Sequence, residues 1–157
     1  MSKLSLAYLA TCEGGEPHTS LMSFSCVDEC AAEASGSPPT IVMTTRRDTK
    51  KFENICARPF VALLVHNAAE EDATASAAAV NVHNAAGGSV SVTLYGHCVA
   101  LDDADERAVR LRAAHLARNT KYPQFIAGPN VAVLAISVFV ASMCDVSDTV
   151  TSWRSSE

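Results

Sequence analysis

Four basic side chains within residues 46–51 (RRDTKK) form the segment of this sequence best suited to chemistry. They are four of the 12 Lys and Arg residues of a chain whose formal net charge is -5. The segment follows an apolar run at 40–43 and precedes a short helical pattern at 52–56. Because the first N–H groups of a helix lack partners within it, lysines and a hydroxyl placed there favour phosphate binding. The alternative is a solvated basic turn in which Asp48 or Thr49 caps the helix.

The composition limits the function classes that need to be considered. With 157 residues, of which 48% are hydrophobic and 18% charged, the chain has the size and composition of one globular domain spanning 1–157. The negative net charge argues against a nucleic-acid-binding surface, so the basic cluster suits a small anion. The longest apolar run, near 131–140, is shorter than the roughly 20 residues that span a bilayer, which predicts a protein outside the membrane.

The cysteines and histidines do not suggest a metal centre. Six cysteines occur without a C-x-x-C pair, and the five histidines do not supply a second ligand pair at a suitable spacing. We therefore expect no metal and reduced, mostly buried thiols in a cytoplasmic protein. His18 and His97 could tune a cofactor or donate protons, although a single histidine on a strand is more often structural.

Apolar periodicity and turn residues predict an α+β fold built around an antiparallel barrel or sheet. The predicted strands span 6–12, 18–27, 41–45, 60–66, 89–101 and 131–144, and the predicted helices span about 49–57 and 102–118, followed by a turn at 122–127. A doubly wound nucleotide-binding fold is disfavoured, because strands and helices do not alternate regularly and the common glycine-rich phosphate loops are absent.

Three details of these elements can be tested against the structure. Gly96 interrupts the alternation of the fifth strand, where a bulge or a close backbone approach is expected. In the second helix we expect Asp102 to be the cap and Val109, Ala113 and Leu116 to face inward. Residues 68–88 are rich in alanine and lack apolar periodicity, which predicts a flexible insertion in a hairpin or a helical turn of its own.

In their order along the chain, these segments resemble the pyridoxamine 5'-phosphate oxidase-like family of FMN-binding split barrels. The resemblance covers residues 6 to about 140 with one gap at the alanine-rich segment. It rests on LATCEGGEPHTSLMSF, on TTRRDTKKFENICARPFVALLV at 44–65, on SVTLYGHCVAL and on DERAVRLRAAHLARNTKYPQFIAGPNVAVLAI. It implies a six-stranded antiparallel split β-barrel with two or three flanking helices, and a homodimer that binds FMN in a cleft between its subunits.

The resemblance also implies which residues contact the flavin. The phosphate would be held at the helix start by Thr49, Lys50 and Lys51, and the ring and ribityl chain would be bounded by the second strand, by the end of the third and by Ser91 on a later strand. The implied cofactor-binding set is Ser20, Leu21, Met22, Ser23, Thr44, Thr45, Thr49, Lys50, Lys51 and Ser91. The residues alone predict only the anion site at 49–51, since a polar second strand is also typical of an exposed hairpin face.

Asp48 does not fit the phosphate site, because a carboxylate at a helix start competes with a bound phosphate for the same N–H groups. We expect it to form an ion pair with Arg46 or Arg47 instead.

Two departures from the family bear on the reaction. Members that oxidise pyridoxamine phosphate carry an Arg near the beginning of the second-strand motif and a Lys at its end, where this chain has Ser20 and Ser25. They also have a C-terminal extension rich in Trp, Arg and His, whereas Trp153 and Arg154 here suggest a frayed tail or a cover for a site in a partner subunit. The clamp for a vitamin B6 substrate is therefore not evident.

These features predict an FMN-binding oxidoreductase that acts on a small molecule, in which the cofactor supplies the hydride or electron chemistry and no catalytic side chain need be obvious in the sequence. The alternative is a non-catalytic dimeric module that carries flavin, deazaflavin or haem.

Overall fold

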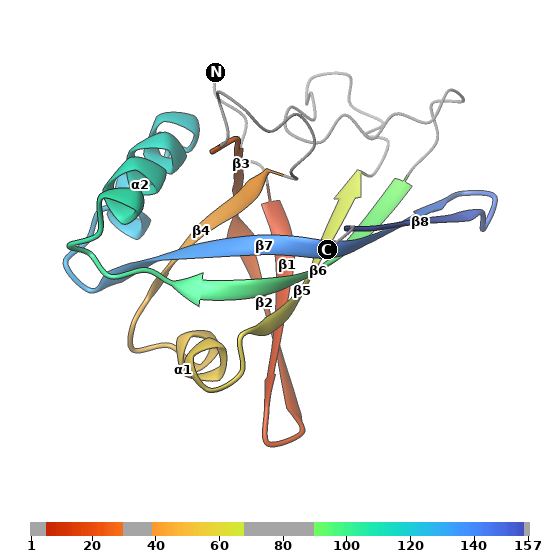
Figure 1. The fold of residues 1–157 in the computed structure, drawn as a ribbon, viewed down its shortest axis with the longest axis horizontal. Coiled ribbons are helices and arrows are strands. Elements are labelled where there is room, and N and C mark those ends of the chain that lie inside the picture. The colour runs from red at the N-terminus through yellow and green to blue at the C-terminus, as the bar shows by residue number, and fades with distance from the viewer. Residues whose placement is uncertain (1–5, 30–38, 68–89, 156–157) are drawn as a thin grey trace.

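The computed structural model describes residues 6–29, 39–67 and 90–155, which form an antiparallel sheet with two α-helices (Figure 1). The predicted alanine-rich insertion at 68–88 lies outside the described residues. The elements are β1 (Leu6–Glu13), β2 (Glu16–Ser23), β3 (Ser25–Val27), β4 (Thr40–Arg46), α1 (Lys50–Ala57), β5 (Phe60–Asn67), β6 (Val90–Ala100), α2 (Glu106–Arg118), the 3-10 helix η1 (Pro123–Phe125), β7 (Val131–Asp145) and β8 (Val150–Arg154).

The strand order forces the sheet to curl. The strands are hydrogen-bonded in the order β2-β1-β5-β6-β7-β4-β3, and β8 pairs with β7. β2 and β3 therefore lie at opposite ends of this path, although only Phe24 separates them in sequence. Since one residue spans less than about 4 Å, the two ends of the sheet must come together. The predicted α+β class with an antiparallel barrel-like sheet is confirmed at this level.

The predicted strand count of six is wrong, because the described residues form eight strands. The strand predicted at 18–27 divides at Phe24, where the chain leaves its pairing with β1 and begins to pair with β4. The second addition is β8, which pairs with the last part of β7 and replaces the expected frayed tail. All five residues of β8 are exposed, so no burial pattern in the sequence indicated this strand.

Gly96 combines the two features expected of it. The register between β6 and β7 shifts between Tyr95 and Gly96, which marks a bulge. A Cβ atom at Gly96 would lie 2.6 Å from Ile136 Cγ2 and 2.9 Å from the Ser137 carbonyl oxygen. Glycine is therefore required here because the backbone of the long strand β7 passes too close for a side chain.

The helix predicted at 49–57 is confirmed as α1, with Thr49 at the N-cap position. The helix ends before Arg58 and Pro59, as the restricted conformation of a residue preceding proline requires. Asn54 and Ile55 form its buried face, and Asn54 Nδ2 donates a 3.0 Å hydrogen bond to Thr11 Oγ1 on β1. This contact fixes the start of α1 relative to the sheet.

The second helix is present, but its predicted cap and buried face are wrong. Asp105 is the N-cap, and its carboxylate accepts a 2.8 Å hydrogen bond from the N–H of Arg107. Two of the three expected inward residues point outward, since Val109 is 59% exposed and Ala113 is also exposed, while Leu116 is half-buried. The buried residues are Ala108, Leu111 and His115. The prediction failed because one residue of the buried face is a histidine, and a polar residue does not contribute to a hydrophobic pattern.

His115 joins α2 to the short strand β3 through a buried polar cluster. Its Nδ1 lies 2.8 Å from Ser25 Oγ, and Asn119 Nδ2 lies 3.0 Å from the same hydroxyl oxygen. All three residues are buried. Burial, with a smaller contribution from the positive charge of Arg118, lowers the pKa of His115 from 6.5 to about 4. The imidazole is therefore neutral at neutral pH, and its Nδ1 shares a hydrogen bond with the Ser25 hydroxyl.

The prediction that the cysteines are mostly buried is wrong. Among the five cysteines in the described part of the chain, only Cys98 is buried, and Cys12 and Cys56 are exposed. None of the helices in the described ranges is both long and apolar enough to cross a membrane.

The buried imidazole predicts a specific loss of stability in mild acid. The unfolded chain takes up a proton at His115 near pH 6.5, whereas the folded chain resists it until about pH 4. The free energy of unfolding therefore falls as the pH drops through this window, with a slope approaching 1.4 kcal/mol per pH unit for this group. Urea unfolding of the wild type and of His115→Gln between pH 7 and 4.5 should show a shallower loss in the variant. Parallel curves, or a ring that titrates near 6.5 by NMR, would contradict this assignment.

Candidate functional site

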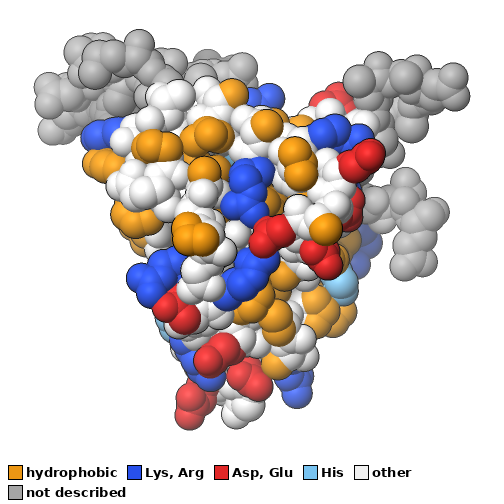
Figure 2. All heavy atoms as spheres, turned by 90° about the vertical axis from the view of Figure 1, so that its left-hand side faces the viewer, with side chains coloured by type: hydrophobic (Ala, Val, Ile, Leu, Met, Phe, Trp, Pro, Cys, Tyr) orange, Lys and Arg blue, Asp and Glu red, His pale blue; other side chains and the backbone are white. Residues whose placement is uncertain are grey.

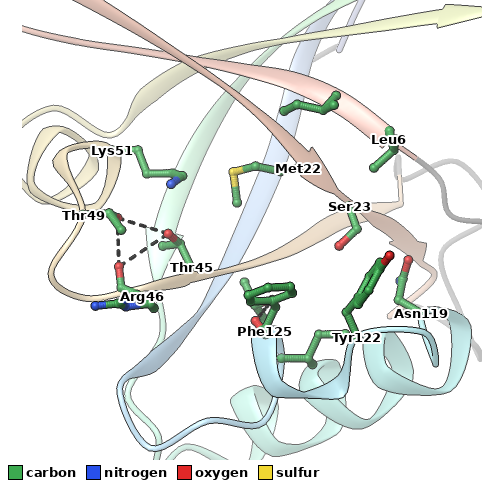
Figure 3. Close-up of a pocket in the computed structure, with 13 residues that line it drawn as sticks. Leu6, Met22, Ser23, Thr45, Arg46, Thr49, Lys51, Asn119, Tyr122 and Phe125 are labelled. Carbon is green, nitrogen blue, oxygen red and sulfur yellow. Dashed lines mark hydrogen bonds between the residues drawn. The ribbon is translucent and has the colours of Figure 1, made fainter.

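A cavity of about 380 Å³ lies between β2, β4, the start of α1 and the segment that follows α2 (Figure 3). Its walls combine cationic, hydroxyl, aliphatic and aromatic side chains. The lining residues are Leu6, Leu21, Met22, Ser23, Thr44, Thr45, Arg46, Thr49, Lys51, Asn119, Tyr122, Phe125 and Ile126.

Seven of the ten sequence-predicted site residues line this cavity. They are Leu21, Met22, Ser23, Thr44, Thr45, Thr49 and Lys51. These residues come from β2, β4 and the start of α1. β2 and β4 are not neighbours in the sheet, but they converge because the chain passes from β2 through Phe24 into β3, which pairs with β4.

The other three predicted residues are not among the lining residues. Ser20 Oγ lies 3.5 Å from His18 Nδ1 on the same strand. The ammonium group of Lys50 forms ion pairs with the carboxylates of Glu13 and Glu53. Ser91 pairs in the strand register with His66 and Cys144, near the beginning of β6. Contact of these three residues with a cofactor stays a prediction.

Six lining residues received no site assignment from the sequence: Leu6, Arg46, Asn119, Tyr122, Phe125 and Ile126. The last four come from the end of α2 and the turn around η1, more than 70 positions after β4 in the sequence. The sequence predicted this turn but gave no sign that it faces the basic cluster. Only the packing of α2 against β3 and β4 brings it there (Figure 1).

Hydroxyl groups and a helix start form one end of the cavity (Figure 3). Thr49 Oγ1 donates a 2.9 Å hydrogen bond to the carbonyl oxygen of Arg46 and lies 3.2 Å from Thr45 Oγ1. The Thr49 side chain makes no hydrogen bond to the N–H groups of α1. The N–H groups of Phe52 and Glu53 donate to the Thr49 carbonyl oxygen, so the uncapped start of α1 offers an anion the positive end of the helix dipole and the N–H groups that precede them.

The four basic residues of the 46–51 cluster have different roles. Arg46 forms an exposed ion pair with Asp48, which confirms the expected pairing of that carboxylate. Arg47 instead reaches Asp103, at 2.9 Å. Lys50 Nζ lies 3.4 Å from Glu13 and 3.7 Å from Glu53.

Lys51 is the basic residue of this cluster that both lines the cavity and has no ion pair with a described residue. Its side chain is partly buried, and burial lowers the pKa of its ammonium group. A partly desolvated cation without a carboxylate partner is stabilised by a bound anion more strongly than a solvated one. Of the residues predicted to hold an anion at 49–51, Thr49 and Lys51 line the cavity and Lys50 does not.

The opposite end of the cavity is aromatic, and hydrogen bonds from two side chains fix its backbone in place. The rings of Tyr122 and Phe125 lie 5.9 Å apart between centroids. Thr44 Oγ1 donates a 2.9 Å hydrogen bond to the carbonyl oxygen of Phe125, and Arg112 donates a 2.6 Å hydrogen bond to that of Ile126. Thr44 therefore helps to form the site by fixing its aromatic wall.

Charge on the surrounding surface is mixed. On the face that carries α2, Lys and Arg side chains are interspersed with Asp and Glu (Figure 2). Asp103 illustrates this, because it bridges Arg47 and Arg112. In the described ranges no group of three or more His, Cys, Asp or Glu residues is arranged to hold a metal ion.

The two ends of the cavity differ in the groups they suit. A cation, hydroxyls and a helix start suit a phosphate, while the aliphatic and aromatic walls suit a planar ring. A phosphorylated ring compound is the ligand class that uses both ends.

Comparison with known proteins agrees with this description. The sequence model of the pyridoxamine 5'-phosphate oxidase family matches residues 1–143. A protein from Schizosaccharomyces pombe, named as a pyridoxamine 5'-phosphate oxidase homologue, is 32% identical over 146 residues, which cover 87% of this chain and 77% of the yeast protein.

Solved structures share the fold at low sequence identity. A haem-binding protein from Mycobacterium smegmatis matches 96% of this chain with a TM-score of 0.66 and 17% identity; this chain spans about half (53%) of its length. An FAD-binding protein from Mesorhizobium loti matches 88% of this chain and 82% of its own length, with a TM-score of 0.59 and 17% identity. Given the match of the family sequence model over residues 1–143, the chain belongs to the pyridoxamine 5'-phosphate oxidase family.

Proposed function

We propose that this chain binds FMN and acts as a flavin-dependent oxidoreductase. The observation that carries the proposal is the unpaired, partly buried ammonium group of Lys51 beside Thr49 and the start of α1. This end of the cavity would hold the flavin phosphate by charge-assisted hydrogen bonds. The walls formed by Leu21, Met22 and the ring of Phe125 would contain the isoalloxazine ring and exclude water from it.

The substrate is proposed to differ from that of pyridoxamine phosphate oxidases. Ser20 and Ser25 stand where those enzymes are expected to carry an Arg and a Lys. Neither serine lines the cavity, and Ser25 is buried in a contact with His115. Membership of the family thus supports a flavin as the cofactor. The serines at positions 20 and 25 support a small-molecule substrate that is not held by the phosphate clamp of pyridoxamine phosphate oxidases.

Titration of the purified apoprotein with FMN tests the cofactor assignment. FMN should bind with a raised melting temperature and a perturbed flavin absorption band, and reduced nicotinamide should bleach that band if the flavin turns over. Lys51→Ala should weaken FMN binding by about 1 to 3 kcal/mol, roughly 5- to 150-fold in Kd, the scale of a hydrogen bond to a charged group.

Lys50→Ala is the matched control, because the adjacent lysine is paired with Glu13 and Glu53 and does not line the cavity. Its effect should stay within about 0.5 kcal/mol. Equal losses in both variants would mean that general charge, and not Lys51, attracts FMN. A Soret band on adding haem, without any response to FMN, would assign the cavity to haem instead.

We further propose that the active unit is a homodimer. Tyr8, Leu21 and Leu64 are 48%, 55% and 39% exposed. They are neighbours across β2, β1 and β5, since Tyr8 pairs with both leucines in the strand register. Contiguous exposed apolar side chains favour burial against another protein. Because Leu21 also lines the cavity, a second copy on this face would cover the flavin.

Leu64→Glu tests the dimer. A charge within this apolar group should shift the protein from dimer to monomer in size-exclusion chromatography with light scattering, and should weaken FMN binding in parallel. Val109→Glu serves as the control, because Val109 is also an exposed apolar residue, at 59%, but lies on the outer side of α2. A wild-type monomer at micromolar concentration, or a dimer unaffected by Leu64→Glu, would contradict the proposed interface.

A further inference from the structure

Among the described residues that line the cavity, Asn119 has the one buried side-chain polar atom without a hydrogen-bond partner. The residue is 3% exposed, and its Oδ1 is buried without a hydrogen-bond partner in the described part of the chain. It lines the cavity beside Tyr122, at the end opposite Lys51 and Thr49 (Figure 3). A buried carbonyl oxygen without a donor is costly, by an amount comparable to a lost hydrogen bond.

The orientation of this amide is fixed by its other contacts. Nδ2 donates a 3.0 Å hydrogen bond to the main-chain carbonyl oxygen of His115 and a 3.0 Å hydrogen bond to Ser25 Oγ. Reversing the amide would place Oδ1 against the His115 carbonyl oxygen, where two acceptors would repel each other. Nδ2 is therefore committed to the protein, and Oδ1 is the atom left for a ligand.

A comparison with Asn54 shows why the cavity matters. Asn54 Oδ1 is also buried without a partner among the described residues, but Asn54 lies between α1 and β1 and does not line the cavity. Asn119 combines an unsatisfied acceptor with a place in the wall of a space large enough for a ligand. Neither Lys nor Arg lines this end, although Lys121 lies 5.2 Å from the ring of Tyr122 outside the lining set.

We propose that Asn119 makes the aromatic end of the cavity a subsite for an uncharged planar group that donates an N–H hydrogen bond to Oδ1. Such a group satisfies the buried acceptor while its ring packs beside Tyr122 and Phe125. A carboxylate of the same shape would place a second acceptor against Oδ1 and is disfavoured. The inference deepens the proposed function, on which it rests for the position of the flavin. The N–H donor has two possible sources, the imide edge of the flavin or a separate substrate.

The first experiment tests the flavin as the source. FMN and 3-methyl-FMN, which lacks the imide N–H, are titrated into the apoprotein and followed by flavin fluorescence. If the flavin supplies the donor, the wild type should bind FMN about 10- to 100-fold more tightly than the methylated form, the range expected for an unpaired buried acceptor. Asn119→Leu should reduce this ratio to about one. Tyr122→Phe, which removes a different polar group from the same wall, should keep it.

The second experiment tests a separate ligand and needs no flavin. Benzamide and benzoate have the same shape, but only benzamide donates an N–H. If the donor belongs to a substrate, the wild type should bind benzamide at least tenfold more tightly than benzoate by NMR titration, with and without FMN, and Asn119→Leu should lose this preference.

The inference is overturned if the wild type shows neither preference, a result that does not depend on whether Asn119→Leu folds. It is also overturned if Tyr122→Phe, and not Asn119→Leu, removes the preference. Failure to bind any FMN while benzamide is preferred would contradict the proposed function and leave this subsite supported. FMN binding without either preference would support the proposed function and contradict the subsite.

Discussion

The connection through Phe24 is the constraint on which the site depends. One residue joins β2 and β3, which stand at the two ends of the hydrogen-bonded sheet. The sheet must therefore curl until these ends meet, and Phe24 is buried at the junction, at 3% exposure. As a consequence Met22 and Ser23 face the end of β4 across the cavity, while Ser25 is directed to α2. Because strand pairing changes at Phe24, the residues before it line the cavity and the residue after it contacts α2.

Ion pairs select which cation of the basic cluster a ligand can use. Asp48, Asp103 and the pair Glu13 and Glu53 engage Arg46, Arg47 and Lys50. Exposed ion pairs contribute little to stability, so their effect here is mainly on specificity. The positive charge of Lys51 is not neutralised by any of these carboxylates. It lies beside a helix start and two threonine hydroxyls. Of the four basic residues in the cluster, Lys51 is thus the one that lines the cavity without an ion pair to a described residue.

The buried cluster of Ser25, His115 and Asn119 links the fold to the proposed chemistry. Neutral His115 holds the Ser25 hydroxyl, and the Asn119 amide is oriented by both residues. In pyridoxamine phosphate oxidases a Lys is expected at the position of Ser25. Replacing a cation by a small hydroxyl removes a phosphate partner and allows a polar contact with α2. The chain therefore shares the fold of the family, and Ser25 takes part in the contact between β3 and α2.

The sequence by itself determined the features that depend on neighbouring residues. The strands at 6–12, 41–45, 60–66, 89–101 and 131–144, the helix at 49–57 and the close approach at Gly96 were all predicted, because periodicity, glycine and proline act locally. An anion site at Thr49, Lys50 and Lys51 was predicted from the same kind of local pattern and stays a prediction; of these residues, Thr49 and Lys51 line the cavity. Family resemblance added the second-strand residues Leu21 to Ser23.

Only the tertiary structure decided the features that depend on distant segments. The division of a predicted strand at Phe24 and the pairing of β8 with β7 depend on which strand is adjacent in space. The buried face of α2 was predicted incorrectly, since His115 is buried by a partner 90 positions away in sequence. The ion pair of Arg47 with Asp103, and the placement of Asn119 and Tyr122 opposite Lys51, likewise arise from long-range packing that no local pattern encodes.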